Sequence, residues 1–400
     1  MSQAAANYLS RRIIGFSLFL LFLLIVGRAS AQRIEDPDQP GQKTEKAQPE
    51  TGSRQIEDDL PRAPAAAAPS ARDWAFAREF SPVFCQDFGP LLPGISAPAP
   101  PAAKSKSGFP LAHADYITRV DFDGNWIADD NWQNFESPAA DFRAAVYFYG
   151  VETESHYFLF FCVFHPRDWG SIHENDLEGA LVVVEKDTAG SAALGRPVYM
   201  ETLSHNVFLK YHHSSLGTHV PGSLGKMLAE GNHPMAYIEP RGHGMHGLTE
   251  SQSQRMSQGD SFVVYRNRKS GEHPADSGLK NVGYELIPLS TSLWVRAQSA
   301  APGARLYCQN RSLGPYRLST RIGERVQTVE KHFPGIGVSL CGDNGRPNAA
   351  HPPWAWSLDG KWFFQPAETI RKDFLLKEVS FSTVYIHHPL LGVVRNPASP

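Results

Sequence analysis

A short acidic stretch stands at the start of one of the most apolar segments of the chain. His-Glu-Asn-Asp-Leu-Glu-Gly, residues 173–179, runs directly into Ala-Leu-Val-Val-Val-Glu. In an extended strand, residues two apart share a face, so the carboxylates of Asp176 and Glu178 lie about 7 Å apart on one face. Two carboxylates beside an apolar strand repel each other and lose hydration, so both stay ionised only next to a cation or a basic side chain. The spacing therefore predicts a site that holds positive charge.

Two further side chains are candidate ligands for a metal ion in this site. His173 is three residues before Asp176, the wrong parity for a straight strand, but it lies in a loop that can turn the imidazole back onto the same face. Asp168 ends the preceding apolar segment and supplies a carboxylate from the neighbouring strand. Carboxylates with one imidazole suit Ca²⁺, Mg²⁺ or Mn²⁺, and Zn²⁺ remains open. The predicted metal ligands are Asp168, His173, Asp176 and Glu178.

Ion pairing is the alternative to a metal at this position. Asp176 and Glu178 can instead pair with Arg167 or Arg241 in a buried ion network, which leaves His173 as an ordinary polar residue. The pattern H-x-x-D-x-E is short, and its spacing alone does not separate the two interpretations.

Residues 144–184 resemble the core of the necrosis- and ethylene-inducing protein-like family. That family has a strand ending in aromatic-x-Pro-Lys-Asp, then a loop and the signature Gly-His-Arg-His-Asp-Trp-Glu running into a valine-rich strand. His173, Asp176 and Glu178 fall on the first His, the Asp and the Glu of the signature. Asp168 falls on the Asp that follows Pro-Lys. The resemblance implies a β-sandwich in which these positions hold a divalent cation that helps to dock glycosylated sphingolipid head groups before membrane damage.

The sequence also departs from that signature. Asn175 stands at its second His, Leu177 at its Trp and Ile172 at its leading Gly, and the loop before the signature is shorter. Arg-Gly-His-Gly at residues 241–244 more loosely resembles a plant and fungal β-sandwich family related to vacuolar protein sorting. The positions implied to hold the ion are kept while their neighbours differ, so the resemblance implies a fold and does not by itself imply toxicity.

Two loops supply candidate ligand-binding residues. His243 and His246 lie in Glu-Pro-Arg-Gly-His-Gly-Met-His-Gly, residues 239–247, where three glycines permit close backbone approach or positive φ. This loop can bring His243 to the rim of the site as a metal ligand or as a contact for a head group, with Arg241 beside it. His205 follows another strand candidate, where the resembled family has a Ser-Ala-His turn. The alternative for both loops is a turn with exposed histidines.

Composition limits the classes of protein to consider. The chain has 400 residues, 42% of them hydrophobic, which is enough for a sizeable core. Its formal net charge of −3 and the lack of a basic stripe interleaved with aromatics argue against a nucleic-acid partner. The sequence contains no G-x-S-x-G and no glycine-rich phosphate loop.

The N-terminus has the pattern of an export signal. Arg11 and Arg12 precede an apolar run of about 14 residues from Ile13 to Val26, and Ala29-Ser30-Ala31 resembles a cleavage site. The run is short compared with the roughly 20 residues of a membrane-spanning helix, although an uncleaved anchor is the alternative. We therefore expect a signal peptide at residues 1–31 and a secreted or periplasmic protein.

The rest of the chain has the pattern of an all-β protein. Residues 32–71 are rich in Pro and Ala and poor in aromatics, which predicts a disordered linker. From residue 72 to residue 400 we expect one β-sandwich domain with long loops, because the apolar segments are short, rich in Val, Tyr, Phe and Thr, and separated by turn residues. Short helices are predicted near residues 223–230 and 367–374.

The four cysteines suggest one disulfide. In an exported chain Cys85, Cys162, Cys308 and Cys341 allow three full pairings. Cys162 lies within Tyr-Phe-Leu-Phe-Phe-Cys-Val-Phe and is predicted to be a buried thiol, and a bridge between Cys308 and Cys341 is the favoured pair.

These observations favour an exported, monomeric binding module over an enzyme. One divalent cation would be presented to a polar, glycosylated or anionic ligand such as a glycolipid head group or carbohydrate, with peripheral membrane contact. The first alternative is a secreted metal-dependent hydrolase in which Glu174, Glu178 or His243 acts as base. The second is a structural envelope protein whose acidic residues are ion-paired.

Overall fold

The computed structural model describes ten stretches of the chain, all in its second compact unit, which runs from Arg62 to Pro400. They are residues 68–87, 116–135, 137–168, 170–187, 194–257, 262–274, 281–298, 305–348, 350–377 and 380–395. The predicted signal peptide and the predicted linker as far as residue 67 lie outside the described residues. At the end of that linker, Ser70 already caps the first described helix through a capping box with Asp73.

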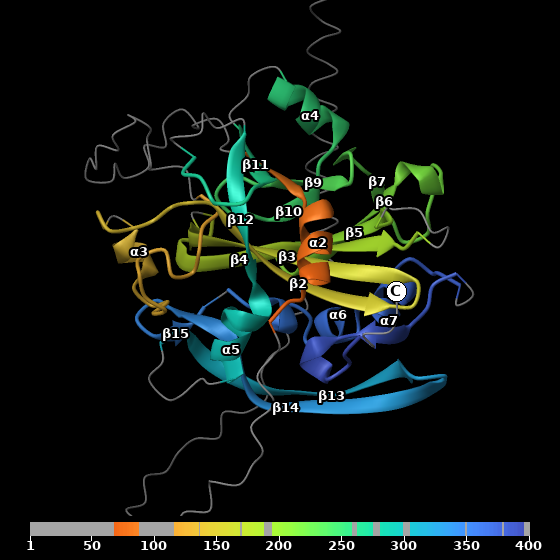
Figure 1. Cartoon of the computed structure of the whole chain (residues 1–400). Helices are drawn as coiled ribbons and strands as arrows, with labels where there is room; N and C mark the ends of the chain where they lie inside the picture. Colours follow the sequence, from red (N-terminus) through yellow and green to blue (C-terminus); the bar gives the residue numbers. More distant parts are fainter. Residues whose placement is uncertain are drawn as a thin grey trace, which may run out of the picture. The chain divides into compact units, whose positions relative to one another are not determined.

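Eleven strands follow one another across a single sheet (Figure 1). In the order of hydrogen bonding they are β10 (Met245–Gly247), β9 (His233–Ile238), β1 (Val83–Asp87), β11 (Phe262–Asn267), β12 (Val282–Pro288), β2 (Ala145–Thr153), β3 (His156–Asp168), β4 (His173–Glu185), β5 (Arg196–Ser204), β6 (Val207–His213) and β7 (Gly225–Met227). From β2 to β6 the pairing is antiparallel between strands that are consecutive in the chain. Sequential hairpins thus build the half of the sheet that carries the acidic residues.

The remaining strands branch from this path or flank it. They are β8 (Ala229–Glu230), β13 (Tyr307–Ile322), β14 (Arg325–Gly342), β15 (Arg346–Pro347) and β16 (Val384–His387). The α-helices are α2 (Ala71–Glu79), α3 (Asn131–Asn134), α4 (Glu250–Ser257), α5 (Leu293–Gln298), α6 (Lys361–Phe364) and α7 (Pro366–Asp373). The described residues also form the 3₁₀ turns η2 (Ser214–Leu216), η3 (Leu289–Thr291), η4 (Pro353–Ala355) and η5 (Pro389–Leu391). Among the described residues, no helix is both long and apolar enough to cross a bilayer.

The sheet curls until its two ends meet. Strands β9 and β10 at one end of the path pack against β4, β5 and β6 near the other end. Strands β3 and β4 are buried along nearly their whole length, as expected for apolar strands covered on both faces. On one side of them pack buried aromatic side chains from the C-terminal part of the chain, such as Trp362 and Phe363 against Phe160. The predicted all-β class with a few short helices is confirmed, in the form of a nearly closed sheet.

One predicted helix is wrong. Residues 223–230 contain the short strands β7 and β8, and Gly225 pairs in parallel with Tyr211 of β6. In a segment this short, hydrogen bonding to a neighbouring strand outweighs local helix preference. The helix predicted near residues 367–374 is present as α7.

The disulfide prediction is confirmed. Cys308 in β13 and Cys341 in β14 are bonded, with Cα atoms 4.8 Å apart, and they join the two long strands near the end at which β14 leaves the hairpin. Cys162 and Cys85 are buried free thiols. The disulfide therefore fixes the part of β14 that reaches β4, where the acidic residues begin.

Candidate metal centre

The acidic residues lie where β3 ends and β4 begins. The two strands pair so that His165 is opposite Asp176 and Asp168 is opposite His173. Asp168 and Asp176 are almost completely buried, with 4% and 7% of their surface exposed. Buried carboxylates lose hydration, so this position needs compensating charge or hydrogen bonds.

Asn175 interrupts the regular alternation of β4 just before Asp176. Its φ is +61°, in the left-handed region, where Asn is one of the few tolerated residues. Its buried amide donates to the carbonyls of Ala128 and Cys341, both at 2.7 Å, and accepts from Asn131 at 2.6 Å. A regular strand would turn the side chains of His173 and Asp176 to opposite faces, and the left-handed residue between them breaks this alternation.

Asp168 is held by the turn that follows it. Its Oδ1 accepts hydrogen bonds from the backbone amides of Gly170, at 2.5 Å, and Ser171, at 2.8 Å. Its Oδ2 lies 3.4 Å from Nε2 of His173. Burial acts to raise the pKa of Asp168, but the contacts with His173 and Ser171 outweigh it and leave the pKa below its ordinary value. Asp168 is therefore a carboxylate at neutral pH.

His243 reaches the acidic residues from the turn between β9 and β10. The β3–β4 and β9–β10 turns touch through their backbones, since the amide of Gly170 donates to the carbonyl of Arg241 at 3.2 Å. A Cβ on Gly170 would lie 3.2 Å from Cα of Gly242, so the close approach favours glycine on both turns. His243 has φ +52° and is 1% exposed, and its Nδ1 lies 3.0 Å from Oδ2 of Asp176.

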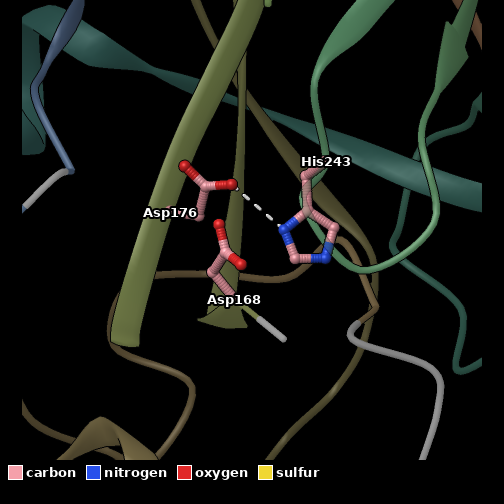
Figure 2. Close-up of side chains that lie close together, drawn as sticks. All are labelled: Asp168, Asp176 and His243. Carbon is pink, nitrogen blue, oxygen red and sulfur yellow. Dashed lines mark hydrogen bonds and ion pairs between the residues drawn. The ribbon is translucent and has the colours of Figure 1, made fainter. Parts of the chain in front are cut away.

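Three potential ligand atoms converge in this place. One from each of Asp168, Asp176 and His243 lies within 4.8 Å of the other two, and Figure 2 shows the two carboxylates and the imidazole turned toward one another. Two oxygens and one imidazole nitrogen are a donor set that divalent cations such as Mn²⁺, Mg²⁺ or Zn²⁺ accept. The residues therefore fit a bound ion.

Glu178 adds an unsatisfied oxygen next to this group. The side chain is buried, and Oε1 accepts a 3.3 Å hydrogen bond from the backbone amide of His205. Oε2 is buried and has no hydrogen-bond partner within the described part of the chain. Burial, and then the nearby charge of Asp176, raise the pKa of Glu178 well above its ordinary value. A buried carboxyl with an unpaired oxygen beside a second carboxylate either keeps its proton or binds a cation.

The basic partners of the alternative interpretation are not in place. Within the described part of the chain, the polar contacts of Asp176 and Glu178 are with His243 and the amide of His205, and neither touches an arginine or lysine. Arg167 points its guanidinium to the carbonyl of Trp132 and to the rings of Trp132 and Phe135. The pairing of Asp176 and Glu178 with Arg167 or Arg241 is therefore not found among the described residues.

His173 is placed differently from the other predicted ligands. Its Nε2 faces Asp168 and its Nδ1 lies 3.1 Å from the carbonyl of Glu174. Burial acts to lower the pKa of His173, but the contact with Asp168 outweighs burial and raises this pKa to about 9. In this arrangement His173 is a charged partner of Asp168, and His243 is the imidazole that completes the group of three.

Comparisons with known proteins agree with the sequence resemblance and show it to be distant. No family model and no curated protein matches the chain. Among solved structures, NLPPya in complex with mannosamine is 17% identical, over 48% of this chain and 70% of that one, with a TM-score of 0.25. Non-toxic HaNLP3 is 16% identical over 46% and 73%, with a TM-score of 0.27.

A third solved structure, Necrosis and Ethylene inducing Protein 2 from the causal agent of cocoa's Witches Broom disease, is 14% identical over 61% of this chain and 95% of that one, with a TM-score of 0.26. The chain thus resembles necrosis- and ethylene-inducing proteins only distantly.

The other predicted ligand-binding residues surround a second carboxylate. His205 and His246 both direct Nε2 at Glu239, at 3.0 and 2.8 Å from Oε2 and Oε1. Hydrogen bonds from His205 and then His246 lower the pKa of Glu239 to about 2. Arg241 has φ +70° and contributes its backbone carbonyl to the contact between the turns, as described above.

Two residues of this region were missed by sequence reasoning. His165 stacks on His243, with ring centroids 3.8 Å apart and planes within 4°. Burial and then the neighbouring His243 lower the pKa of His165 well below its ordinary value, so it packs as a neutral ring. The register of the β3–β4 hairpin would have identified His165 as the neighbour of Asp176. Glu239 carried no signal beyond its place in a histidine-rich loop.

Proposed function

We propose that the protein binds one divalent cation through Asp168, Asp176 and His243. The observation that carries the proposal is the convergence of three ligand atoms, two of them from buried carboxylates, without an arginine or lysine contact to Asp176 or Glu178 among the described residues. The raised pKa of Glu178, to which the nearby charge of Asp176 contributes, supports it, since a cation at this place would offset that charge. Ca²⁺, Mg²⁺ and Mn²⁺ suit these oxygen ligands, and the imidazole also admits Zn²⁺.

The ion would give this end of the sheet a binding function. It offsets the negative charge of the two aspartates and can accept an oxygen from an outside ligand. The residues of the chain hold the ion in place: the β3–β4 turn fixes Asp168 through two amides, and stacking on His165 orients His243. We propose that the protein is exported and monomeric, and that the ligand is polar and carbohydrate-like, such as a glycosylated lipid head group reached by peripheral membrane contact.

Asp176→Asn tests the metal site. We expect the variant to lose affinity for Mn²⁺ by more than about 100-fold, because loss of a partner outside the coordination shell already costs 10–100-fold. Calorimetric titration of the chelator-treated protein gives the affinity. Asp359→Asn is the matched control, since Asp359 pairs with Lys361 on the surface and should leave affinity unchanged. Equal Mn²⁺ affinity in Asp176→Asn and wild type would refute the site.

Ligand binding is a separate measurement. Mannosamine and glucosamine, with which NLPPya has been solved, are suitable first probes, followed by vesicles that contain glycosylated sphingolipids. We expect binding that requires the metal and is lost in Asp176→Asn. Binding of equal strength with and without metal would contradict a metal-presented ligand.

A metal-dependent hydrolase is the second candidate function, and Glu178 is the observation that favours it. A buried carboxyl with a raised pKa and a free oxygen near a metal site resembles a general acid or base. Glu174 fits this role less well, because its oxygens accept from the amides of Trp132 and Asp343. Turnover of ester, phosphate or glycoside substrates that follows metal content would establish the hydrolase, and its absence across all three classes would exclude it in favour of binding.

A further inference from the structure

Among the described residues, one short stretch of β2 has no neighbouring strand on the edge that faces away from β3. On this edge β12 pairs with β2 as far as Phe148, and β16 pairs with it from Glu152 onward. Pairing stops between these residues because β12 runs into the 3₁₀ turn η3 and β16 runs into η5. We call this interval, residues 149–151, the β2 gap. Gly150 lies at its centre and is the only residue of β2 that is not buried.

The backbone of Gly150 directs its N–H and its C=O into the β2 gap. At the two ends of β2, Ala144 accepts a backbone hydrogen bond from β12 and Glu154 donates one to β16, each at 3.0 Å. Alternate residues of a strand bond to the same edge, and the register with β3 is unbroken from Tyr147 to Glu152, so Gly150 faces this edge as well. Among the described residues, neither β12 nor β16 makes a hydrogen bond to Gly150.

The residue that would extend β16 along the gap is a proline. Continuing the pairing beyond His387 brings Pro389 opposite Gly150, and proline has no N–H to donate to the carbonyl of Gly150. Pro389 also begins the 3₁₀ turn η5. One donor and one acceptor of the sheet edge are thus left for another molecule, and exposed edges of this kind pair readily with further chains.

A cavity of about 150 Å³ opens beside Gly150. Pro389 and Val394 supply part of its apolar wall. His387 also lines it, and both ring nitrogens are buried without a hydrogen bond among the described residues, although Nε2 lies 3.4 Å from Oδ1 of Asp73. A cavity of about this volume holds a molecule of the size of benzene. The β2 gap therefore combines a backbone donor and acceptor with space for a small apolar group.

We propose that the β2 gap binds a small N-acylated amino acid amide in the manner of one added strand residue. A residue that exchanges both hydrogen bonds with an antiparallel neighbour presents N–H and C=O on the two sides of one Cα carbon. The ligand therefore contains the unit NH–CHR–CO. A small R group such as methyl suits the wall at Pro389 and Val394, and η3 and η5 limit the space to one residue. The site shares no residue with the candidate metal centre.

Two matched ligands test the proposal by NMR on the full chain labelled with ¹⁵N-glycine, in the presence of chelator. N-acetylalanine amide should shift the amide signal of Gly150 saturably, with a Kd of about 1 mM, as expected for about nine non-hydrogen atoms. That signal is assigned by its loss in Gly150→Ala. The control ligand is O-acetyl-lactamide, in which an ester oxygen replaces the N–H. It should bind at least about fivefold more weakly, because the carbonyl of Gly150 then has no donor.

Two variants locate the bound ligand, with binding followed on the ligand signals. Gly150→Pro removes the backbone donor and Val394→Trp fills the cavity, and each should weaken binding of N-acetylalanine amide by at least about fivefold. Val326→Trp, at another exposed valine on β14, is the control and should bind as the wild type does. Far-UV circular dichroism shows whether each variant is folded, and Val394→Trp suffices if Gly150→Pro is not. An unshifted Gly150 signal, equal binding of the two ligands, or unchanged binding in Val394→Trp would overturn the site.

Discussion

At the scale of single residues, the candidate metal centre contains buried carboxyl groups that the described side chains do not fully pair. Asp176 contacts one imidazole nitrogen of His243, and the buried Oε2 of Glu178 has no hydrogen-bond partner among the described residues. Leaving a buried polar group without a partner costs about 1–3 kcal/mol, and more for a charged one. We therefore expect the site to destabilise the fold without the proposed ion and to stabilise it with the ion.

Glu178→Gln tests whether the contribution of this carboxyl to stability changes sign when the ion binds. In metal-free protein at neutral pH we expect the substitution to stabilise the fold by about 1–3 kcal/mol, because it removes a carboxyl that burial and Asp176 disfavour in its charged form. In protein saturated with Mn²⁺ we expect destabilisation, since a carboxylate near the ion is lost. Thermal unfolding with chelator and with Mn²⁺ measures both.

Glu185→Gln, at the exposed end of the same strand, is the control for that comparison and should behave alike in the two conditions. If Glu178→Gln shifts stability in the same direction with chelator and with Mn²⁺, the carboxyl of Glu178 does not respond to an ion, and its lack of a partner must have another cause.

At the scale of elements, Asn175 is the residue that shapes the start of β4. Its left-handed backbone and its three buried hydrogen bonds place it between α3 and β14, and the disulfide holds β14 at Cys341. The amide of Asn175 bonds the carbonyl of Cys341 itself. The direction of Asp176 is thus set by contacts with segments that lie far away in the sequence.

Two substitutions at Asn175 separate backbone strain from hydrogen bonding. Asn175→Gly keeps the left-handed conformation and loses the side-chain bonds, whereas Asn175→Ala loses both. We expect both variants to be destabilised, and Ala by about 1–3 kcal/mol more than Gly. Chemical denaturation measures the free energies of unfolding. Equal losses in the two variants would show that the positive φ carries no cost for alanine here.

Strands were predictable where the chain is apolar on both faces, and less so elsewhere. The hairpin of β2 and β3 and the strand β4 stand out in the sequence because burial on both sides leaves long apolar runs. The hairpin of β13 and β14 did not, because one face is exposed and Gly314-Pro315 and Pro334-Gly335 interrupt the alternation. The helix prediction for residues 223–230 was wrong because β7 pairs with β6 and β8 pairs with β9.

The candidate site was likewise predictable from the sequence only in part. Asp168 and Asp176 could be related through one hairpin, since antiparallel pairing brings the end of one strand to the start of the next. His243 reaches Asp176 because two turns that are about 70 residues apart in the chain contact each other. The spacing of residues along the sequence does not predict such a contact. The sequence placed His243 at the rim of the site, as a metal ligand or as a contact for a head group.

At the scale of the whole molecule, buried ion pairs tie the first described helix to the end of the described chain. Arg395 contacts Asp73 of α2 and Glu152 of β2, and Glu152 is 1% exposed. Burial acts to raise the pKa of Asp73, but His387 and then Arg395 outweigh it and hold it below its ordinary value of 3.8. Without Arg395, Asp73 keeps His387 and Glu152 keeps Lys186 and Arg72, so two buried carboxylates are left less well compensated.

Arg395→Ala should therefore destabilise the protein in a pH-dependent manner. Because the carboxyl pKa of Asp73 is depressed in the fold, the stability it contributes is present above about pH 4 and is lost as the pH falls through the folded value. We expect a loss of about 3 kcal/mol at neutral pH that shrinks below about pH 4. Denaturation across this pH range measures it.

Arg143→Ala, which removes an exposed pair with Asp141, is the control and should cost about 1 kcal/mol or less. A loss in Arg395→Ala that is the same at all pH values would indicate that the arginine contributes through packing and not through charge.

The location of a bound ion tests the account most directly. Crystals of the full chain grown with Mn²⁺ should give an anomalous scattering peak bonded to Asp168, Asp176 and His243, with the hydrogen bond between His243 and Asp176 replaced by bonds to the ion. Crystals with no peak between these residues under saturating Mn²⁺, and with His243 still 3.0 Å from Asp176, would contradict it.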